Sequence, residues 1–259
     1  MIKTQIKPQQ TRIKKKMFEE LRPHLIELRK RLFISVVCVI VMFFVCLSFH
    51  EYILKFLTIP VENALPEFSK KMTFVELPEP LFTAMKVSFF TGFLFSLPVI
   101  FWQFWLFVAP GLYDNEKKLV LPFVLSATFM FLLGASFCYL IVIPMAFKFL
   151  IIFGSANNLT PLISIGLYVG FFIKLMLAFG LAFEMPIFTY FLAKLGIVND
   201  AFLKKHFRIA ILLIFIFAAL MTPPDVLSQF LMAIPLCLLY ALSIYIAKKV
   251  NPAKDEDNA

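Results

Sequence analysis

Cysteine and histidine are scarce in this chain, which has four of the first and three of the second in 259 residues. The cysteines form no C-x-x-C pair and all fall within apolar runs, so the sequence indicates neither a disulfide framework nor a zinc site. It also has no H-E-x-x-H motif, no G-x-S-x-G elbow and no glycine-rich phosphate loop. We therefore predict that the protein is not an enzyme and uses no metal or cofactor.

Charged residues are also few, at 16% of the chain, whereas hydrophobic residues make up 61% and the mean hydropathy is +0.88. A soluble domain carries about 45 to 50% apolar residues and cannot enclose several apolar runs of about 20 residues in one core. The composition excludes an ordinary soluble protein and indicates a chain that crosses a membrane several times.

The apolar runs predict an all-α integral membrane protein with six transmembrane helices. A helix rises about 1.5 Å per residue, so about 20 residues cross a hydrocarbon core of about 30 Å. The fifth run is short, and a Thr-Pro-Pro-Asp turn joins it to the sixth. We therefore predict a hairpin of these two spans, with Asp225 as the N-cap of the last helix. The predicted spans are Leu32–Phe49, Leu81–Ala109, Leu119–Ile143, Tyr168–Leu195, Phe207–Met221 and Val226–Ala247.

The N-terminal region divides into two parts. Residues 1–16 are polar and basic without apolar periodicity, which predicts a disordered cytoplasmic tail attracted to anionic lipids. Met17–Arg31 has apolar residues at three- and four-residue spacing, which predicts an amphipathic helix leading into the first span. Its polar side carries four residues at helical spacing: Glu20, His24, Glu27 and Arg31.

Prolines set the expected loops. The stretch Glu51–Pro80 contains four of them and is predicted to be an ordered external loop with only short helical pieces. Pro144 is predicted to stop the third span, with a loop over Met145–Ser164 behind it. One membrane domain is thus expected over residues 17–249, followed by a cytoplasmic tail over residues 250–259.

The basic residues are distributed unevenly between the predicted loops. With the N-terminus in the cytoplasm, about 19 Lys and Arg residues lie inside and 4 outside. Cytoplasmic loops carry such an excess in membrane proteins, so both termini are predicted to be cytoplasmic. The net charge of +9 therefore reflects topology, and we expect no nucleic-acid partner.

Glu184 lies within the fourth predicted span, in a run of Ala, Leu, Phe and Met residues. An ionised acid at that depth costs about 2.5 to 3.5 kcal/mol on insertion scales, so such a residue is by default a functional candidate. A neutral carboxyl group that links neighbouring helices by hydrogen bonding is the structural alternative. An ion- or proton-coupled transporter is the functional alternative, although Lys174 is ten residues away, about 15 Å along the axis, and cannot pair with it directly.

Glu27 and Glu116 fall on the same predicted face of the membrane. A carboxylate can hold a guanidinium group in a two-bonded, charge-assisted fork, so two such acids could recognise a pair of arginines. Each could equally be a solvated charge at the membrane interface.

Several motifs in order resemble the TatC family, the core subunit of the twin-arginine protein translocase. The run His24–Arg31 (HLIELRKR) resembles its N-terminal signature. The resemblance covers roughly Leu21 to Lys249. The other matching stretches are Phe107–Tyr113 followed by Glu116, Phe179–Gly180 with Phe183–Pro186, and Thr222–Asp225 followed by Ser228, Gln229 and Ala233–Pro235.

This resemblance implies a receptor in the bacterial cytoplasmic (inner) membrane for the twin-arginine signal peptides of folded proteins. It further implies single-span partners of the TatA and TatB types, self-association in the complex, a lipid bilayer as surroundings, and export driven by the proton gradient. By position, Glu27 and Glu116 would bind the arginine pair, while Arg29 and Phe107 would shape that surface.

The resemblance also assigns residues away from the cytoplasmic face. Glu184 would contact a partner helix or a deeply inserted signal peptide, and Asp225 and Gln229 would lie in a partner-contact region. Pro60, in the outer loop, is a further candidate. One departure is Lys117–Lys118, where arginines are common in the family, which weakens any two-bonded role for these side chains.

Overall fold

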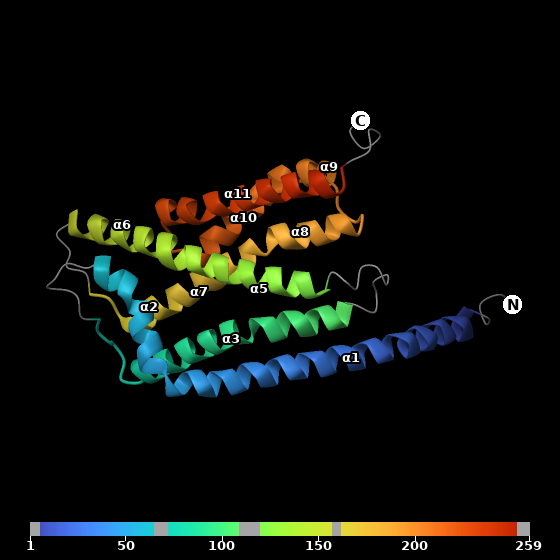
Figure 1. The fold of residues 1–259 in the computed structure, drawn as a ribbon, viewed down its shortest axis with the longest axis horizontal. Coiled ribbons are helices and arrows are strands. Elements are labelled where there is room, and N and C mark those ends of the chain that lie inside the picture. The colour runs from blue at the N-terminus through green and yellow to red at the C-terminus, as the bar shows by residue number, and fades with distance from the viewer. Residues whose placement is uncertain (1–5, 65–71, 109–119, 157–161, 253–259) are drawn as a thin grey trace.

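The computed structural model describes residues 6–64, 72–108, 120–156 and 162–252 (Figure 1). Within them every regular element is helical, and an isolated β-bridge joins Thr73 to Ser164. Five helical segments are long and apolar enough to cross a membrane, and α10 (Phe207–Met221) is a shorter apolar helix. The predicted all-α class is therefore confirmed for the part of the chain that is described.

The first two helices are longer than the sequence predicted. α1 (Ile6–Ser48) unites the amphipathic helix with the first span and begins within the stretch predicted to be disordered. A helix extends at little cost once its neighbour is helical, because nucleation is the expensive step. α2 (His50–Ala64) occupies the start of the predicted external loop and is a 15-residue helix that contains Pro60, so the prediction of only short helical pieces is wrong there.

The third span continues through Pro144. α5 (Val120–Phe137) passes into a π-helical turn, Cys138–Val142, and then into α6 (Ile143–Ala156). The Ile143 N–H donates to the Cys138 carbonyl, which is the five-residue spacing of a π-helix. This wider turn changes the hydrogen-bond register immediately before the proline, so the missing N–H of Pro144 does not end the helix. The predicted stop at Pro144, and the loop from Met145, are therefore wrong.

The second and fourth spans match the predicted ranges closely, but the fourth is interrupted. α3 (Glu79–Val108) is continuous. The fourth span consists of α7 (Ile165–Phe183) and α8 (Met185–Lys194), with Glu184 in the turn between them. Pro186 has no N–H to donate to the carbonyl four residues earlier, so the helical ladder breaks at this point.

The last part of the chain is the predicted hairpin. A short helix, α9 (Asp200–Lys205), precedes α10, and α11 (Val226–Val250) follows the proline turn. Asp225 is the N-cap of α11, and its Oδ1 accepts a hydrogen bond from the Ser228 N–H at 2.7 Å. The predicted cap is confirmed.

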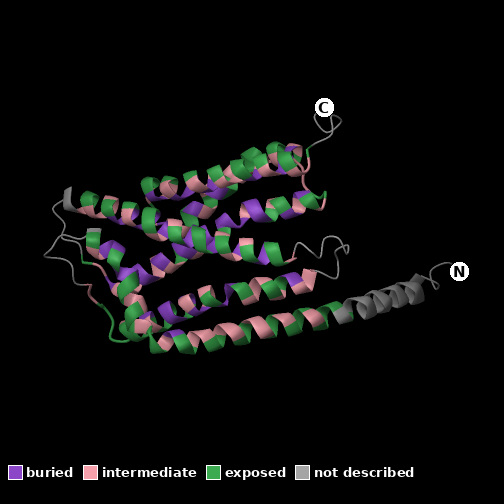
Figure 2. Cartoon of the chain, in the orientation of Figure 1, coloured by how far each residue is buried: buried purple, intermediate pink, exposed green. Residues whose placement is uncertain are grey.

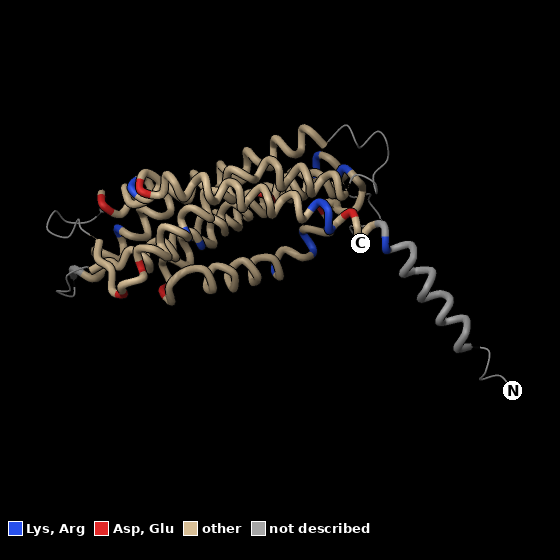
Figure 3. Tube along the Cα trace, turned by 90° about the horizontal axis from the view of Figure 1, so that it is seen from below, with Lys and Arg blue, Asp and Glu red and all other residues tan. Residues whose placement is uncertain are grey.

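The helices form an elongated bundle in which α7 is central and α1 is peripheral. α7 contacts α3, α5, α10 and α11, whereas α1 packs mainly on α3. Figure 2 accordingly shows buried residues concentrated in the middle helices, while α1 is exposed or half-buried along most of its described length. Most charged residues lie toward the two ends of the bundle, which leaves an apolar middle (Figure 3).

Candidate functional site

Glu27 lies on the face of α1 that packs against the end of α3. Arg31, one turn later, donates from Nη2 to Glu27 Oε1 at 3.2 Å and from Nη1 to Oε1 of Gln103 in α3 at 3.4 Å. The side chains of Glu27 and Arg31 keep 32% and 24% of their surface exposed. The carboxylate is thus oriented by neighbouring side chains and remains accessible.

An aromatic contact fixes the neighbouring turn of the same face. The rings of His24 and Phe107 are stacked, with centroids 4.3 Å apart and an angle of 29° between their planes. His24, Glu27 and Arg31 recur at helical spacing, so the predicted polar side of α1 is the side that meets α3. The stack and the Arg31–Gln103 hydrogen bond therefore hold α1 to α3 on either side of the Glu27 carboxylate.

The structure assembles only part of the expected peptide site. It brings Glu27 and Phe107 to the same helix contact. Arg29 is exposed and lies about 200° around α1 from Glu27, on the opposite side of the helix. Glu116 falls in residues 109–119, outside the described part of the chain. Gln103 was not singled out from the sequence, because its contact depends on the register between α1 and α3.

Glu184 is buried in the middle of the fourth span, with 2% of its surface exposed. Its carboxyl group lies beside the backbone of Phe131 in α5, and neither carboxylate oxygen has a hydrogen-bond partner among the described residues. Lys174 is exposed, whereas Glu184 is buried, so the two groups do not face each other. The carboxyl group is a polar group enclosed by apolar side chains at a break between helices.

The break lies where α5 and α7 approach each other closely. A Cβ atom at Gly180 would lie 2.5 Å from the ring of Phe131, and one at Gly134 would lie 2.6 Å from the carbonyl oxygen of Phe179. Small residues permit such contact between membrane helices. Beyond this contact an apolar cavity of about 530 Å³ opens between α5, α8 and α11, lined by residues that include Met130, Tyr190 and Leu242.

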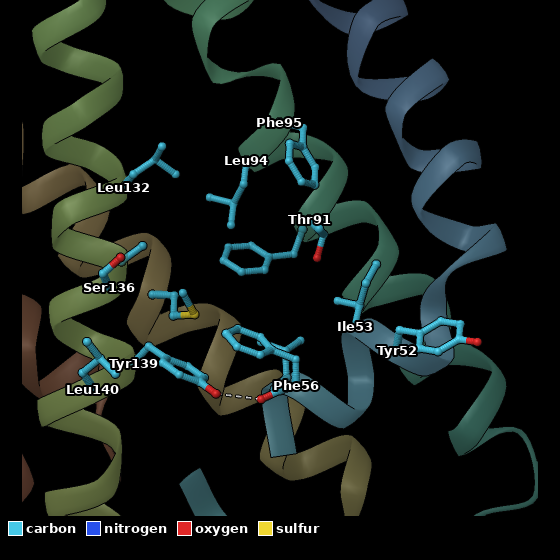
Figure 4. Close-up of a pocket in the computed structure, with 14 residues that line it drawn as sticks. Tyr52, Ile53, Phe56, Thr91, Leu94, Phe95, Leu132, Ser136, Tyr139 and Leu140 are labelled. Carbon is cyan, nitrogen blue, oxygen red and sulfur yellow. Dashed lines mark hydrogen bonds between the residues drawn. The ribbon is translucent and has the colours of Figure 1, made fainter. Parts of the chain in front are cut away.

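Pro60 lies in α2, at the end of the bundle opposite to Glu27, and a side chain from another helix bonds the carbonyl that it leaves without a donor. Because Pro60 has no N–H, it cannot donate to the Phe56 carbonyl four residues earlier. The hydroxyl group of Tyr139, in the π-helical turn, donates to that carbonyl at 2.7 Å (Figure 4). Tyr168 of α7 donates in the same way to the next carbonyl, that of Leu57, at 2.6 Å. Two tyrosines therefore attach α2 to the bundle at its proline.

These contacts close one end of a cavity of about 660 Å³ between α2, α3 and α5. Its lining is almost entirely apolar, with Thr91 and Ser136 among the few polar residues (Figure 4). Tyr139 both lines this cavity and donates the hydrogen bond to α2. Pro60 thus lies in α2, the helix that forms one wall of the cavity, and does not line the cavity itself.

The hairpin residues Asp225 and Gln229 have different environments. Gln229 Nε2 donates to the Phe215 carbonyl at 3.1 Å, which ties α11 to α10. Asp225 uses Oδ1 for its cap, whereas Oδ2 and the hydroxyl of Ser228 are buried without hydrogen-bond partners among the described residues. Asp225 also lines an apolar cavity of about 530 Å³ between the end of α6 and the start of α11.

A second polar cluster, at the same end as Pro60, was not anticipated from the sequence. Glu79 at the start of α3 accepts hydrogen bonds from the Gly166 N–H at 2.7 Å, the Val75 N–H at 2.6 Å and the Ser164 hydroxyl. The Thr73 N–H donates to the Ile163 carbonyl at 3.1 Å, beside this carboxylate. These bonds join the segment before α3 to the start of α7.

Comparison with known proteins supports a single assignment. A family profile described as "Sec-independent protein translocase protein (TatC)" matches residues 23–235. A TatC protein of Campylobacter jejuni is 65% identical over 243 residues, covering 93% of this chain and 99% of the relative. A TatC protein of Helicobacter pylori is 51% identical over 245 residues, covering 93% of this chain and 94% of the relative.

The fold agrees with this assignment. A crystal structure titled "Crystal Structure of Twin Arginine Translocase Receptor- TatC" superposes with a TM-score of 0.79 at 39% identity, covering 88% of this chain and 99% of that chain. The membrane-spanning helices and these bacterial relatives indicate a multi-pass protein of the bacterial inner membrane. The chain belongs to the TatC family of Sec-independent protein translocase proteins.

Proposed function

We propose that this chain is the signal-peptide receptor and core subunit of a twin-arginine translocase. In this proposal it binds the twin-arginine signal peptides of folded proteins at the junction of α1 and α3. Together with single-span partners of the TatA and TatB types, it then mediates export driven by the proton gradient. The observation that carries the proposal is the Glu27 carboxylate, oriented by Arg31 and still 32% exposed at the end of the bundle.

The proposed topology has six spans with both termini in the cytoplasm. α10 supplies the additional short span, since 15 residues extend about 22 Å. In Figure 1 the start of α1 and the end of α11 lie at the same end of the bundle, as an even number of spans requires. The excess of Lys and Arg in loops at this end supports its cytoplasmic location.

Recognition of an arginine pair follows from carboxylate chemistry. A guanidinium group is planar and can donate two parallel hydrogen bonds to one carboxylate, whereas an ammonium group is a compact point charge. Glu27 supplies one such acceptor, and Glu116 would supply the second from the loop after α3. Phe107, held by its stack on His24, would provide an apolar surface beside Glu27.

The partner contacts are proposed to lie at the broken fourth span and the short hairpin. The carboxylate oxygens of Glu184 are buried without a hydrogen-bond partner in the described residues. Oδ2 of Asp225 is also buried and has no partner there. An unpaired polar group in an apolar setting is stabilised when another helix supplies a donor. Gln229 has its amide nitrogen bonded within the hairpin, so its proposed role is to fix the geometry of this contact region.

The test of the proposal is the affinity of a synthetic signal peptide for the full-length protein in lipid nanodiscs. We expect Glu27→Gln and Glu116→Gln each to weaken binding of an Arg-Arg peptide by roughly 10- to 150-fold, because a charge-assisted hydrogen bond contributes about 1.5 to 3 kcal/mol. Glu51→Gln, an exposed acid in α2, is the matched control and should leave the affinity unchanged. Equal binding of Arg-Arg and Lys-Lys peptides by every variant would contradict the proposal.

A further inference from the structure

The pairing of Glu27 with Arg31 places a guanidinium group on the carboxylate that is proposed to receive another one. We propose that Arg31 sets the affinity of this site: it occupies Glu27 in the free protein as an internal substitute for a signal-peptide arginine and is displaced when the peptide binds. This inference rests on the proposed function, because it concerns the same carboxylate.

The pair between Arg31 and Glu27 does not use the full hydrogen-bonding capacity of the carboxylate. Of the two carboxylate oxygens of Glu27, Arg31 bonds Oε1 alone, at 3.2 Å, and its other terminal nitrogen donates to Gln103. A guanidinium group that arrives from outside can instead present both of its parallel N–H groups to the two carboxylate oxygens. The internal pair is therefore a one-bonded version of the contact that the peptide would make with two bonds.

Arg31 is also held loosely. Its bonds of 3.2 and 3.4 Å are longer than the 2.7 to 2.9 Å that is usual for charge-assisted hydrogen bonds. Its Nε is buried and has no hydrogen-bond partner among the described residues, which costs free energy in this position. A modest gain from an incoming ligand is enough to displace it.

Arg31 lowers the affinity of the site for any cation that replaces it. Breaking the Arg31 contact costs the same free energy whichever side chain arrives, so it reduces the affinity for arginine and for lysine by the same factor. The preference for arginine comes from the second hydrogen bond that a guanidinium group, unlike an ammonium group, can make with the carboxylate.

The alternative explanation of these contacts is that Arg31 only holds α1 against α3, through its hydrogen bond to Gln103. The two roles predict opposite effects of removing it. If Arg31 occupies the site, its loss frees the carboxylate and tightens binding. If Arg31 only positions Glu27, its loss lets the carboxylate move away and weakens binding.

The experiment compares Arg31→Gln with Arg22→Gln in the full-length protein in nanodiscs, using synthetic Arg-Arg and Lys-Lys signal peptides as probes. Arg22 is exposed and lies five residues before Glu27, about 140° around the helix, so this control removes the same charge without touching the pair. We expect Arg31→Gln to tighten Arg-Arg binding by about two- to fivefold relative to Arg22→Gln, the range for a partly exposed ion pair. The Lys-Lys peptide should tighten by the same factor, so that the preference for arginine is unchanged.

Two further variants identify the cause. Arg31→Lys keeps the charge with an ammonium group and should give an intermediate affinity. In a Glu27→Gln background the difference between Arg31→Gln and Arg22→Gln should vanish, because there is no carboxylate left to free. Thermal melting of each variant verifies that it is folded.

The outcomes separate this inference from the proposed function. If wild type prefers the Arg-Arg peptide and Glu27→Gln weakens it, but Arg31→Gln binds no more tightly than Arg22→Gln, the role of Arg31 is overturned and the receptor proposal stands. If wild type shows no preference and Glu27→Gln changes nothing, the receptor proposal and the inference are both overturned.

Discussion

The first span and the fourth span of this bundle have similar apolar character and very different surroundings. In the most apolar stretch of α1, 6% of the residues are buried within the protein, against 50% in the segment formed by α7 and α8. α1 is attached along one side to α3, whereas α7 is surrounded by neighbours. Hydropathy alone does not distinguish a helix that faces lipid or partners from one that forms the core.

The polar residues of the two spans differ correspondingly. Glu27 of α1 lies at the end of the bundle and is oriented by Arg31 while it stays partly exposed. Glu184 lies at the break between α7 and α8, buried and without a hydrogen-bond partner among the described residues. The first arrangement suits reversible binding of a charged ligand, and the second places an unmet hydrogen-bonding group inside the apolar part of the protein.

The largest expected difference between the spans is in packing. Phe172 of α7 is completely buried, so Phe172→Ala should lower the free energy of unfolding by about 3 to 5 kcal/mol through the cavity that it leaves. Phe44 of α1 is 61% exposed, and Phe44→Ala should change stability by less than about 0.5 kcal/mol. Thermal or denaturant unfolding in the same detergent measures both. Similar losses would show that α1 is packed as tightly as α7.

An intermediate effect is expected at the break in the fourth span. Glu184→Leu removes a buried polar group that lacks a partner, so it should raise the free energy of unfolding by about 1 to 3 kcal/mol. Export of a folded reporter protein should fall in the same variant. Glu184→Gln, which keeps a polar group of similar size, is the control and should stay close to wild type in stability. A destabilised Glu184→Leu protein would mean that the carboxyl group is paired in the native state.

The smallest effect is expected where α2 meets the core. Tyr139→Phe removes the donor to the Phe56 carbonyl and should cost about 1 kcal/mol of unfolding free energy. In a Pro60→Ala background the new backbone N–H can donate to that carbonyl, so the same tyrosine substitution should cost less. Tyr52→Phe, at an exposed tyrosine in α2, is the control. If Tyr139→Phe lowers the free energy of unfolding equally in both backgrounds, the backbone N–H at position 60 does not take over from the tyrosine hydroxyl as donor to the Phe56 carbonyl.

The sequence predicted the spans well because their lengths depend on local composition. The second and fourth spans agree to within a few residues at each end, and Asp225 caps α11 as its position after two prolines indicated. The polar side of α1 was also correct, since helical spacing alone places His24, Glu27 and Arg31 together.

The errors came from prolines whose effects depend on distant residues. Pro144 does not end its helix because a π-helical turn precedes it, and Pro60 lies within α2 because Tyr139 supplies the missing donor from 79 residues further along the chain. The pairing of Arg31 with Gln103 depends on the register of two helices. None of these contacts follows from the local pattern around the residue concerned.

The replacement of a backbone N–H by the tyrosine hydroxyl at Phe56 constrains how this chain can evolve. Pro60 is tolerated within α2 because Tyr139 is present, whereas Tyr139 is needed only while Pro60 is there. A lineage can therefore lose the proline first and the hydroxyl second, but the reverse order passes through a protein with an unbonded carbonyl. The two positions should show directional epistasis, and among relatives phenylalanine at position 139 should occur mainly where position 60 is not proline.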